Sequence, residues 1–157
     1  MLYGRAGSGK STIAASIADH SDYFFYEADN DITEDMRQAL ANQQPFTDAM
    51  RDAFVAQLIE HIQRLKLKHK KIVVAQGLYK QRHRQQIEAA IESCDAICVE
   101  TDEQAILHRL GTRQGGISSA SAAALKADFQ KPLAEQKTLL NNTGMSDVFT
   151  QLRAWYN

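Results

Sequence analysis

Short apolar runs alternate along the chain with longer stretches in which apolar residues recur at helical spacing. The runs at residues 23–26, 72–75 and 96–99 are typical of short buried strands, and Leu139-Leu140 is a candidate last strand. Helices are predicted at residues 11–19, 33–42, 47–66, 80–92, 101–110 and 121–131, with a last one from Ser146. Strands that alternate with helices imply an α/β protein with a parallel sheet covered on both faces.

Nothing in the sequence divides the chain into separate parts, because it contains no internal repeat, proline-rich linker or low-complexity tract. The longest predicted helix follows Thr47, a suitable N-cap, and carries Phe54 and Leu58 on the same face. A Gly- and Ser-rich stretch at residues 111–121 is predicted as a loop. We therefore expect a single domain over residues 1–157.

The composition argues against several classes of protein. The 157 residues include 18 Lys and Arg against 19 Asp and Glu, a formal net charge of -1, which disfavours a dedicated nucleic-acid binder. No apolar run approaches the roughly 20 residues that cross a bilayer, and no signal segment opens the chain. Cys94 and Cys98 lie only four residues apart, which argues against a disulfide framework. We expect a cytoplasmic protein without membrane partners.

The most informative motif is the segment GRAGSGKST at residues 4–12, which matches G-x-x-x-x-G-K-S/T in full. Glycines allow successive backbone N–H groups to turn inward onto a phosphate chain, and the following helix adds its positive dipole end. Lys10 is expected to reach the β- and γ-phosphates of ATP, and the Ser11 hydroxyl to ligate Mg²⁺. The alternative, an ordinary Gly-rich turn, explains neither the helix pattern nor the α/β alternation. The predicted nucleotide-binding residues are Gly4, Gly7, Ser8, Gly9, Lys10, Ser11 and Thr12.

Only Met1, Leu2 and Tyr3 precede this loop. A phosphate-binding loop normally follows a buried central strand of about five residues. Either the central strand is unusually short, or the natural chain starts further upstream.

Beyond the loop, two segments that contain charged residues resemble segments of the small P-loop kinases, most closely those of the gluconate kinases. Residues 27–33, EADNDIT, lie in register with the family's Asp-Gly/Ala-Asp-Asp-Phe-His-Pro, and residues 45–51, PFTDAMR, match its Pro-Leu-Thr-Asp-x-Asp-Arg. The resemblance implies a three-layer P-loop NTPase fold with a five-stranded parallel sheet in the order 2-3-1-4-5. It also implies a substrate-binding region at about residues 27–52 and a small lid at about residues 109–121.

By that resemblance, Asp29 would orient or deprotonate the acceptor hydroxyl, and Arg51 would hold an anionic group of the substrate. The chemistry is reasonable, since a carboxylate accepts a proton and a guanidinium grips an anion bidentately. The alternatives are an Asx turn for Asp29 and a surface pair with Asp48 for Arg51. The family's His is Ile32 here and its Lys-Met pair is Ala39-Leu40. These departures argue against gluconate itself and for a related small hydroxylated acceptor.

Two further groups of cations are candidate site residues. Arg109 and Arg113 resemble lid arginines that close over the nucleotide, Arg109 on the nucleotide and Arg113 on the transferring phosphate. The alternative is that both complement a helix dipole. In the cluster Lys80, Arg82, His83 and Arg84, Lys80 is predicted to bind a substrate anion, and the other three are predicted to form a solvated helix face.

The sequence thus predicts an ATP- and Mg²⁺-dependent kinase that phosphorylates a hydroxyl of a small molecule. One alternative is a regulatory ATPase, favoured by the lack of an Asp at the end of the apolar run at 72–77. Another is a kinase of a nucleoside or a nucleic-acid end. The sequence leaves open whether the protein is a monomer or a homodimer.

Overall fold

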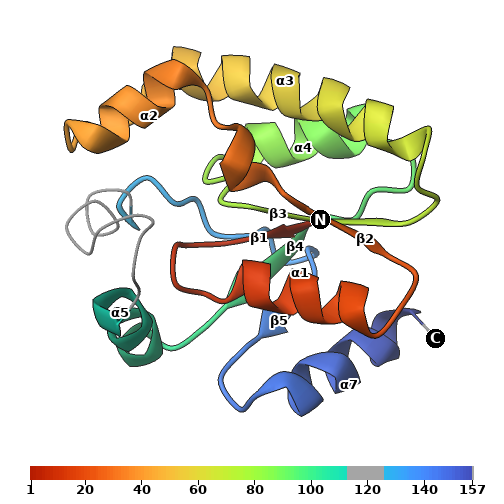
Figure 1. Ribbon diagram of the computed structural model, residues 1–157. Helices are drawn as coiled ribbons and strands as arrows, with labels where there is room; N and C mark the ends of the chain where they lie inside the picture. The colour runs from red at the N-terminus through yellow and green to blue at the C-terminus, as the bar shows by residue number, and fades with distance from the viewer. Residues whose placement is uncertain (113–125, 157) are drawn as a thin grey trace.

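The computed structural model describes residues 1–112 and 126–156. Its centre is a five-stranded sheet with the order β2-β3-β1-β4-β5, in which every neighbouring pair is parallel (Figure 1). The predicted strand order is therefore confirmed. The strands are β1 (Leu2–Tyr3), β2 (Phe24–Glu27), β3 (Ile72–Gln76), β4 (Ile97–Glu100) and β5 (Thr138–Leu140).

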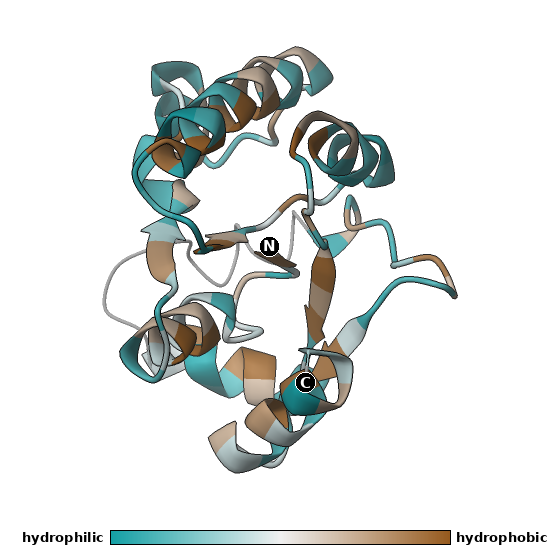
Figure 2. Ribbon diagram, turned by 90° about the vertical axis from the view of Figure 1, so that its right-hand side faces the viewer, coloured by the Kyte–Doolittle hydropathy of each residue, from teal (hydrophilic) through white to brown (hydrophobic). Residues whose placement is uncertain are grey.

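Helices cover both faces of the sheet, which confirms the three-layer fold. Helices α3 and α4 lie over one face, and α1 and α7 over the other (Figure 1). Apolar residues of these helices face the sheet (Figure 2). In the described parts of the chain, no helix is long and apolar enough to span a membrane. The helices are α1 (Lys10–Asp19), α2 (Glu34–Ala41), α3 (Asp48–Lys66), α4 (Gln81–Ala90), α5 (Glu103–Thr112) and α7 (Met145–Tyr156), with a 3₁₀ turn η1 (Ala28–Asp31) after β2.

The central strand β1 contains only two residues, yet both of its edges are fully used. Leu2 pairs with β3 and β4 and packs into the core under α1 and α7, whereas Tyr3 packs into the core under α3 and α4. Hydrogen bonding continues beyond the strand, from the Ile97 amide to the Met1 carbonyl (2.8 Å) and from the Gly4 amide to the Gly77 carbonyl (3.3 Å). The short strand therefore sits in an ordinary parallel ladder that delivers Gly4 to the carboxyl edge of the sheet.

Side-chain caps fix two helix starts on the way to the site. The hydroxyl of Thr33 accepts a hydrogen bond from the Met36 amide, and that of Thr47 accepts one from the Met50 amide (3.2 Å). Thr47 is thus the N-cap that the sequence predicts. The helix predicted at residues 121–131 is wrong at its carboxyl end, because residues 129–133 are not helical, and residues 121–125 lie outside the described residues.

Arg84 holds the chain around Gln130 against the loop that follows β3. The Arg84 side chain is fully buried and donates hydrogen bonds to the carbonyls of Leu78 (2.8 Å), Tyr79 (3.1 Å) and Gln130 (2.7 Å). Its guanidinium carbon lies 4.1 Å from the centre of the Tyr3 ring. The prediction of a solvated face is therefore wrong for Arg84, whose charge is satisfied by carbonyls and aromatic rings.

His83, the residue before Arg84, is also buried, and its Nε2 lies 2.7 Å from an oxygen of Asp52. Burial is the main cause that lowers the pKa of His83. Only Arg82 of the three lies on an exposed face, where it pairs with Asp48 and Asp52. Helix α4 therefore turns two of its three predicted surface cations inward.

We predict that replacing Arg84 by Met will destabilise the fold by about 3 kcal/mol or more, because several buried carbonyls lose their donor. The free energy of unfolding in urea is the measurement. The matched control is Arg82→Met, which removes a half-exposed ion pair and should cost less than about 1 kcal/mol. Equal effects of the two substitutions would contradict the structural role given to Arg84.

Candidate nucleotide and acceptor site

The loop at residues 4–9 leaves β1 and enters α1 with the glycines in backbone conformations that other residues avoid. Gly9 is the N-cap of α1 with φ 96°. Gly4 has φ +151°, and a Cβ built on it would lie 2.6 Å from the Val99 carbonyl oxygen. Both positions therefore require glycine, one for its conformation and the other also for the close approach of β4.

Three side chains from the ends of β4 and β5 and from α5 donate hydrogen bonds to one carbonyl of this loop. The Ser8 carbonyl accepts hydrogen bonds from Asn141 Nδ2 (2.9 Å), the Thr101 hydroxyl (3.0 Å) and Arg109 Nη1 (3.3 Å). Arg109 also donates to the Gly7 carbonyl (3.2 Å). The structure thus places Arg109 at the loop. Arg113 and the rest of the predicted lid, residues 113–121, lie outside the described residues.

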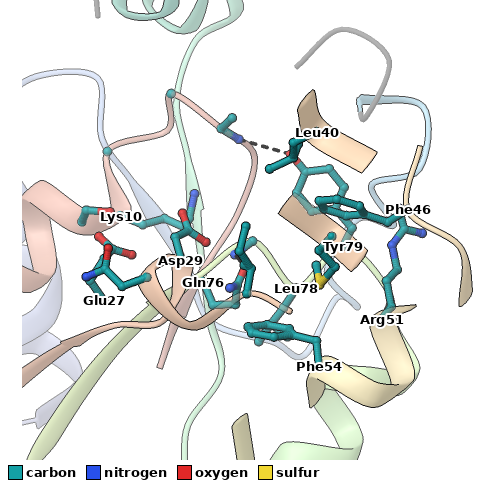
Figure 3. A pocket seen from close by; sticks show the side chains of 18 of the residues that line it. Lys10, Glu27, Asp29, Leu40, Phe46, Arg51, Phe54, Gln76, Leu78 and Tyr79 are labelled. Carbon is teal, nitrogen blue, oxygen red and sulfur yellow. Dashed lines mark hydrogen bonds between the residues drawn. The ribbon is translucent and has the colours of Figure 1, made fainter. Parts of the chain in front are cut away.

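The catalytic lysine predicted by the motif starts α1. Lys10 is buried, and its Nζ donates a hydrogen bond to the Arg5 carbonyl across the loop (3.0 Å). The Ala6 amide donates to the Tyr79 hydroxyl (3.3 Å), the dashed contact in Figure 3. The loop therefore leads into the amino-terminal end of α1 with one lysine across it, which is a geometry suited to a phosphate chain.

Glu27, at the end of β2, is a site residue that the sequence reasoning did not single out. Burial raises the pKa of its carboxyl, an effect partly offset by the hydroxyl of Ser11 and by the charge of Lys10. Its Oε1 is buried without a hydrogen-bond partner among the described residues. The signal was present, because Glu27 opens the acidic segment that carries Asp29.

An oxygen-rich corner next to the loop suits a magnesium ion. The Ser11 hydroxyl and the spare Glu27 oxygen are the hard oxygen donors that Mg²⁺ prefers. Within residues 1–112 and 126–156, no group of three or more His, Cys, Asp or Glu side chains is placed to hold a metal ion alone. An ion at this corner would accordingly need oxygens of the nucleotide as well.

The loop opens into a cavity of about 780 Å³ that continues between η1, α2, α3 and the end of β3. Figure 3 shows Lys10, Glu27 and Asp29 at one end of it, and Arg51 beside Phe46 and Tyr79 at the other. Asp29 is exposed to the cavity from η1. The structure thus brings together the three residues on which the predicted chemistry depends, Lys10, Asp29 and Arg51.

Arg51 is buried and has a partner that the sequence did not indicate. Its Nη2 lies 2.9 Å from one oxygen of Asp128, and Lys80 Nζ lies 3.7 Å from the other. The hydrogen bond from Arg51, aided by the charge of Lys80, lowers the pKa of Asp128. The alternative of a surface pair with Asp48 is wrong, because Asp48 faces Arg82 instead. No local pattern pointed to Asp128, which is 77 residues away from Arg51.

A glycine-rich loop between a central parallel strand and a helix, in a sheet of order β2-β3-β1-β4-β5, defines a P-loop protein with the fold of the small kinases. The chain belongs to the AAA domain family, whose model matches residues 1–132. No curated protein sequence matches it significantly.

Solved structures with this fold cover nearly the whole chain. A sugar kinase from Janibacter sp. HTCC2649 superposes with a TM-score of 0.80 and 21% identity, covering 98% of this chain and 89% of that one. A gluconokinase from Sinorhizobium meliloti 1021 gives 0.79 and 19%, covering 98% and 90%. The Mycobacterium tuberculosis APS kinase, solved with AMPPNP and APS, gives 0.58 and 19%, covering 98% and 92%. The predicted gluconate-kinase-like fold is confirmed.

We predict that Gly4→Ala will abolish binding of an ATP analogue, because its Cβ would meet the Val99 carbonyl and displace the loop. Isothermal titration measures the binding. The control is Gly111→Ala in α5, where nothing lies within 4 Å of the added Cβ. Retained binding in Gly4→Ala would show that the loop tolerates a shift at this strand.

The raised pKa of Glu27 predicts a pH dependence of stability. A carboxyl with a higher pKa in the folded than in the unfolded protein stabilises the fold at acidic pH, and this contribution disappears as pH rises from 4.5 through the folded pKa. In nucleotide-free protein, the free energy of unfolding of the wild type relative to Glu27→Gln should therefore fall with rising pH. Urea unfolding of both proteins from about pH 4 to 8 measures it.

Glu103 provides a control of opposite sign. Hydrogen bonds from Arg5 and Lys126 lower the pKa of this exposed carboxyl to about 2. Its contribution is therefore present above 4.5 and disappears as pH falls toward 2. For Glu103→Gln, the difference in the free energy of unfolding between wild type and variant should grow with rising pH. The same trend for Glu27→Gln would contradict the burial of Glu27.

Proposed function

We propose that the protein is an ATP-dependent kinase that transfers the γ-phosphate to a hydroxyl of a small molecule. The observation that carries this proposal is the shared cavity, into which both the phosphate-binding loop and Asp29 open, with Arg51 at its far end. A sugar acid or a related hydroxylated acid is the acceptor suggested by the resemblance to gluconate kinases. A cytoplasmic location suits this function, because the reaction consumes ATP.

The loop residues would bind and orient the nucleotide. Backbone amides at the start of α1 would hold the phosphates, and Lys10 would exchange its contact with the Arg5 carbonyl for the β- and γ-phosphates. Ser11, with Glu27 beside it, would hold Mg²⁺, which when bound supplies charge neutralisation of the phosphates. Arg109, fixed to the loop, adds a positive charge close to the nucleotide. Arg113 remains a proposed contributor from the segment that follows α5.

Asp29 would act on the acceptor. Its carboxylate would accept the proton of the acceptor hydroxyl while that oxygen forms a bond to the γ-phosphorus, and the bond to the bridging oxygen of ADP breaks. Arg51 would hold the opposite end of the acceptor, so that the hydroxyl is fixed in line with the phosphate. Lys80 lies at the second oxygen of Asp128 and would support that end.

Two alternatives predict different readouts. A regulatory ATPase would hydrolyse ATP without any acceptor and would leave the half of the cavity beyond Asp29 without a role. A kinase of nucleic-acid ends would lose activity steeply with salt, because polymer binding rewards many phosphate contacts. A small acceptor would keep its activity in high salt.

We expect ADP release to depend on an added acceptor and to disappear in Lys10→Ala. Asp29→Asn should retain nucleotide binding but lose about a hundredfold or more in kcat, because the proton acceptor is removed. A coupled ADP assay with a panel of alcohols measures both. The matched controls are Lys70→Ala, an exposed cation of the α3–β3 loop, and Asp35→Asn, at an exposed carboxylate of α2 outside the cavity lining.

Acceptors can be found first by thermal shift. A ligand at a hundredfold excess over Kd stabilises the folded state by roughly 2.7 kcal/mol, so a compound that binds will raise Tm. Each compound is tested with and without a nonhydrolysable ATP analogue. Acceptor-independent hydrolysis as the only activity, across the whole panel, would refute the kinase function.

A further inference from the structure

The half of the cavity beyond Asp29 has an apolar wall. Figure 3 shows Leu40, Phe46, Phe54 and Leu78 around this space, which lies between α2, α3 and the end of β3. Phe54 and Leu78 belong to the main core of the protein, whereas Leu40 and Phe46 are only half buried. The apolar wall consists of Ile32, Met36, Leu40, Phe46, Phe54, Val55 and Leu78.

Polar groups that line this half are engaged with the protein. His83 lies against Asp52, and the Tyr79 hydroxyl accepts from the Ala6 amide. Arg51 pairs with Asp128, so it offers only part of its guanidinium, at the far end of the cavity. The Tyr79 hydroxyl keeps its own hydrogen as a donor, but it lies against the Ala6 amide of the loop. The wall beyond it, toward Arg51, is formed mainly by hydrocarbon side chains such as Leu40, Phe46 and Phe54.

At the reacting end of the cavity, Gln76 contributes a further polar group. The Gly77 amide donates to Oε1 of Gln76, which fixes the orientation of the Gln76 amide group. Gln76 lines the cavity, and its Nε2 is buried without a hydrogen-bond partner among the described residues. Gln76 and Asp29 together can receive one hydroxyl, with Asp29 accepting its proton and Gln76 donating to its oxygen.

From this distribution we infer that the acceptor has an apolar body between its reacting hydroxyl and its anionic end. The inference rests on the proposed kinase function and concerns the class of acceptor. The hydroxyl would lie between Asp29 and Gln76, the hydrocarbon or aromatic body would pack on Leu40, Phe46 and Phe54, and the anionic group would reach Arg51. The acceptor oxygen bonds to the γ-phosphorus, its proton goes to Asp29, and ADP leaves.

A polyhydroxylated acid fits this wall poorly. Each hydroxyl along its chain would lose water on entering and would meet carbon atoms, which leaves a polar group unpaired. A body without hydroxyl groups leaves no polar group unpaired, and its contact with the aromatic rings stabilises the complex. Selectivity against the polyol should therefore come from the wall, and not from the two ends that both acceptors share.

A matched pair of acceptors tests the inference. Gluconate and ω-hydroxyhexanoate have the same carbon chain, terminal hydroxyl and carboxylate, and differ only in the hydroxyls between them. Since one unmatched hydroxyl in an apolar pocket costs up to about a hundredfold, kcat/KM should favour ω-hydroxyhexanoate by about a hundredfold or more. The aromatic analogue para-(hydroxymethyl)benzoate should also be preferred to gluconate.

A single substitution in the wall should reduce this preference. Leu40→Gln adds an amide at a half-buried wall position. It should lower the ratio of kcat/KM for ω-hydroxyhexanoate to kcat/KM for gluconate by about tenfold. The control is Leu65→Gln, at a half-buried leucine near the carboxyl end of α3, which should leave the ratio unchanged. Because the ratio is measured within one variant, a loss of stability does not affect it.

The outcomes separate this inference from the proposed function. Phosphorylation of gluconate at least as efficient as that of ω-hydroxyhexanoate would overturn the apolar acceptor and leave the kinase function intact. The same conclusion follows if only polyhydroxylated compounds in the wider panel are phosphorylated. ATP-analogue binding without phosphorylation of any alcohol would refute the kinase function itself.

Discussion

The Ser8 carbonyl is the point on which the nucleotide side of the structure depends. It accepts hydrogen bonds from Asn141, Thr101 and Arg109, which come from the end of β5, the β4–α5 loop and α5. These hydrogen bonds fix the orientation of the Ser8 peptide immediately before α1 begins. Residues at the ends of β4 and β5 and in α5 therefore hold in place a loop that follows the central strand.

The acceptor side is built by another part of the chain. Its walls come from η1, α2, the first half of α3 and the loop after β3, and its far end is completed by Asp128. Arg84 joins the two ends of this region, since it binds carbonyls of both the β3–α4 loop and the segment around Gln130. The molecule thus has a nucleotide half tied to β4 and β5 and an acceptor half tied to α3 and α4.

Much of the fold could be predicted because local sequence patterns determine where its strands, helices and phosphate-binding loop lie. The short apolar runs marked the strands, Thr47 marked a helix start, and the loop motif located Lys10 and Ser11. Local patterns failed where a residue's environment is assembled from distant segments. Arg84 looked like a surface cation because its aromatic and carbonyl partners, Tyr3 and Gln130, are far away in sequence. Asp128 could not be linked to Arg51 for the same reason.

The separation of the two halves has a consequence for how such a protein can change over evolutionary time. Leu40 and Phe46 line the cavity, yet both are half buried and neither lies in the sheet. Substitutions there would alter the acceptor that fits while leaving the loop, the sheet and the three donors on Ser8 untouched. The wall on α2 and at the start of α3 is consequently where a new acceptor preference can arise at the least cost to folding.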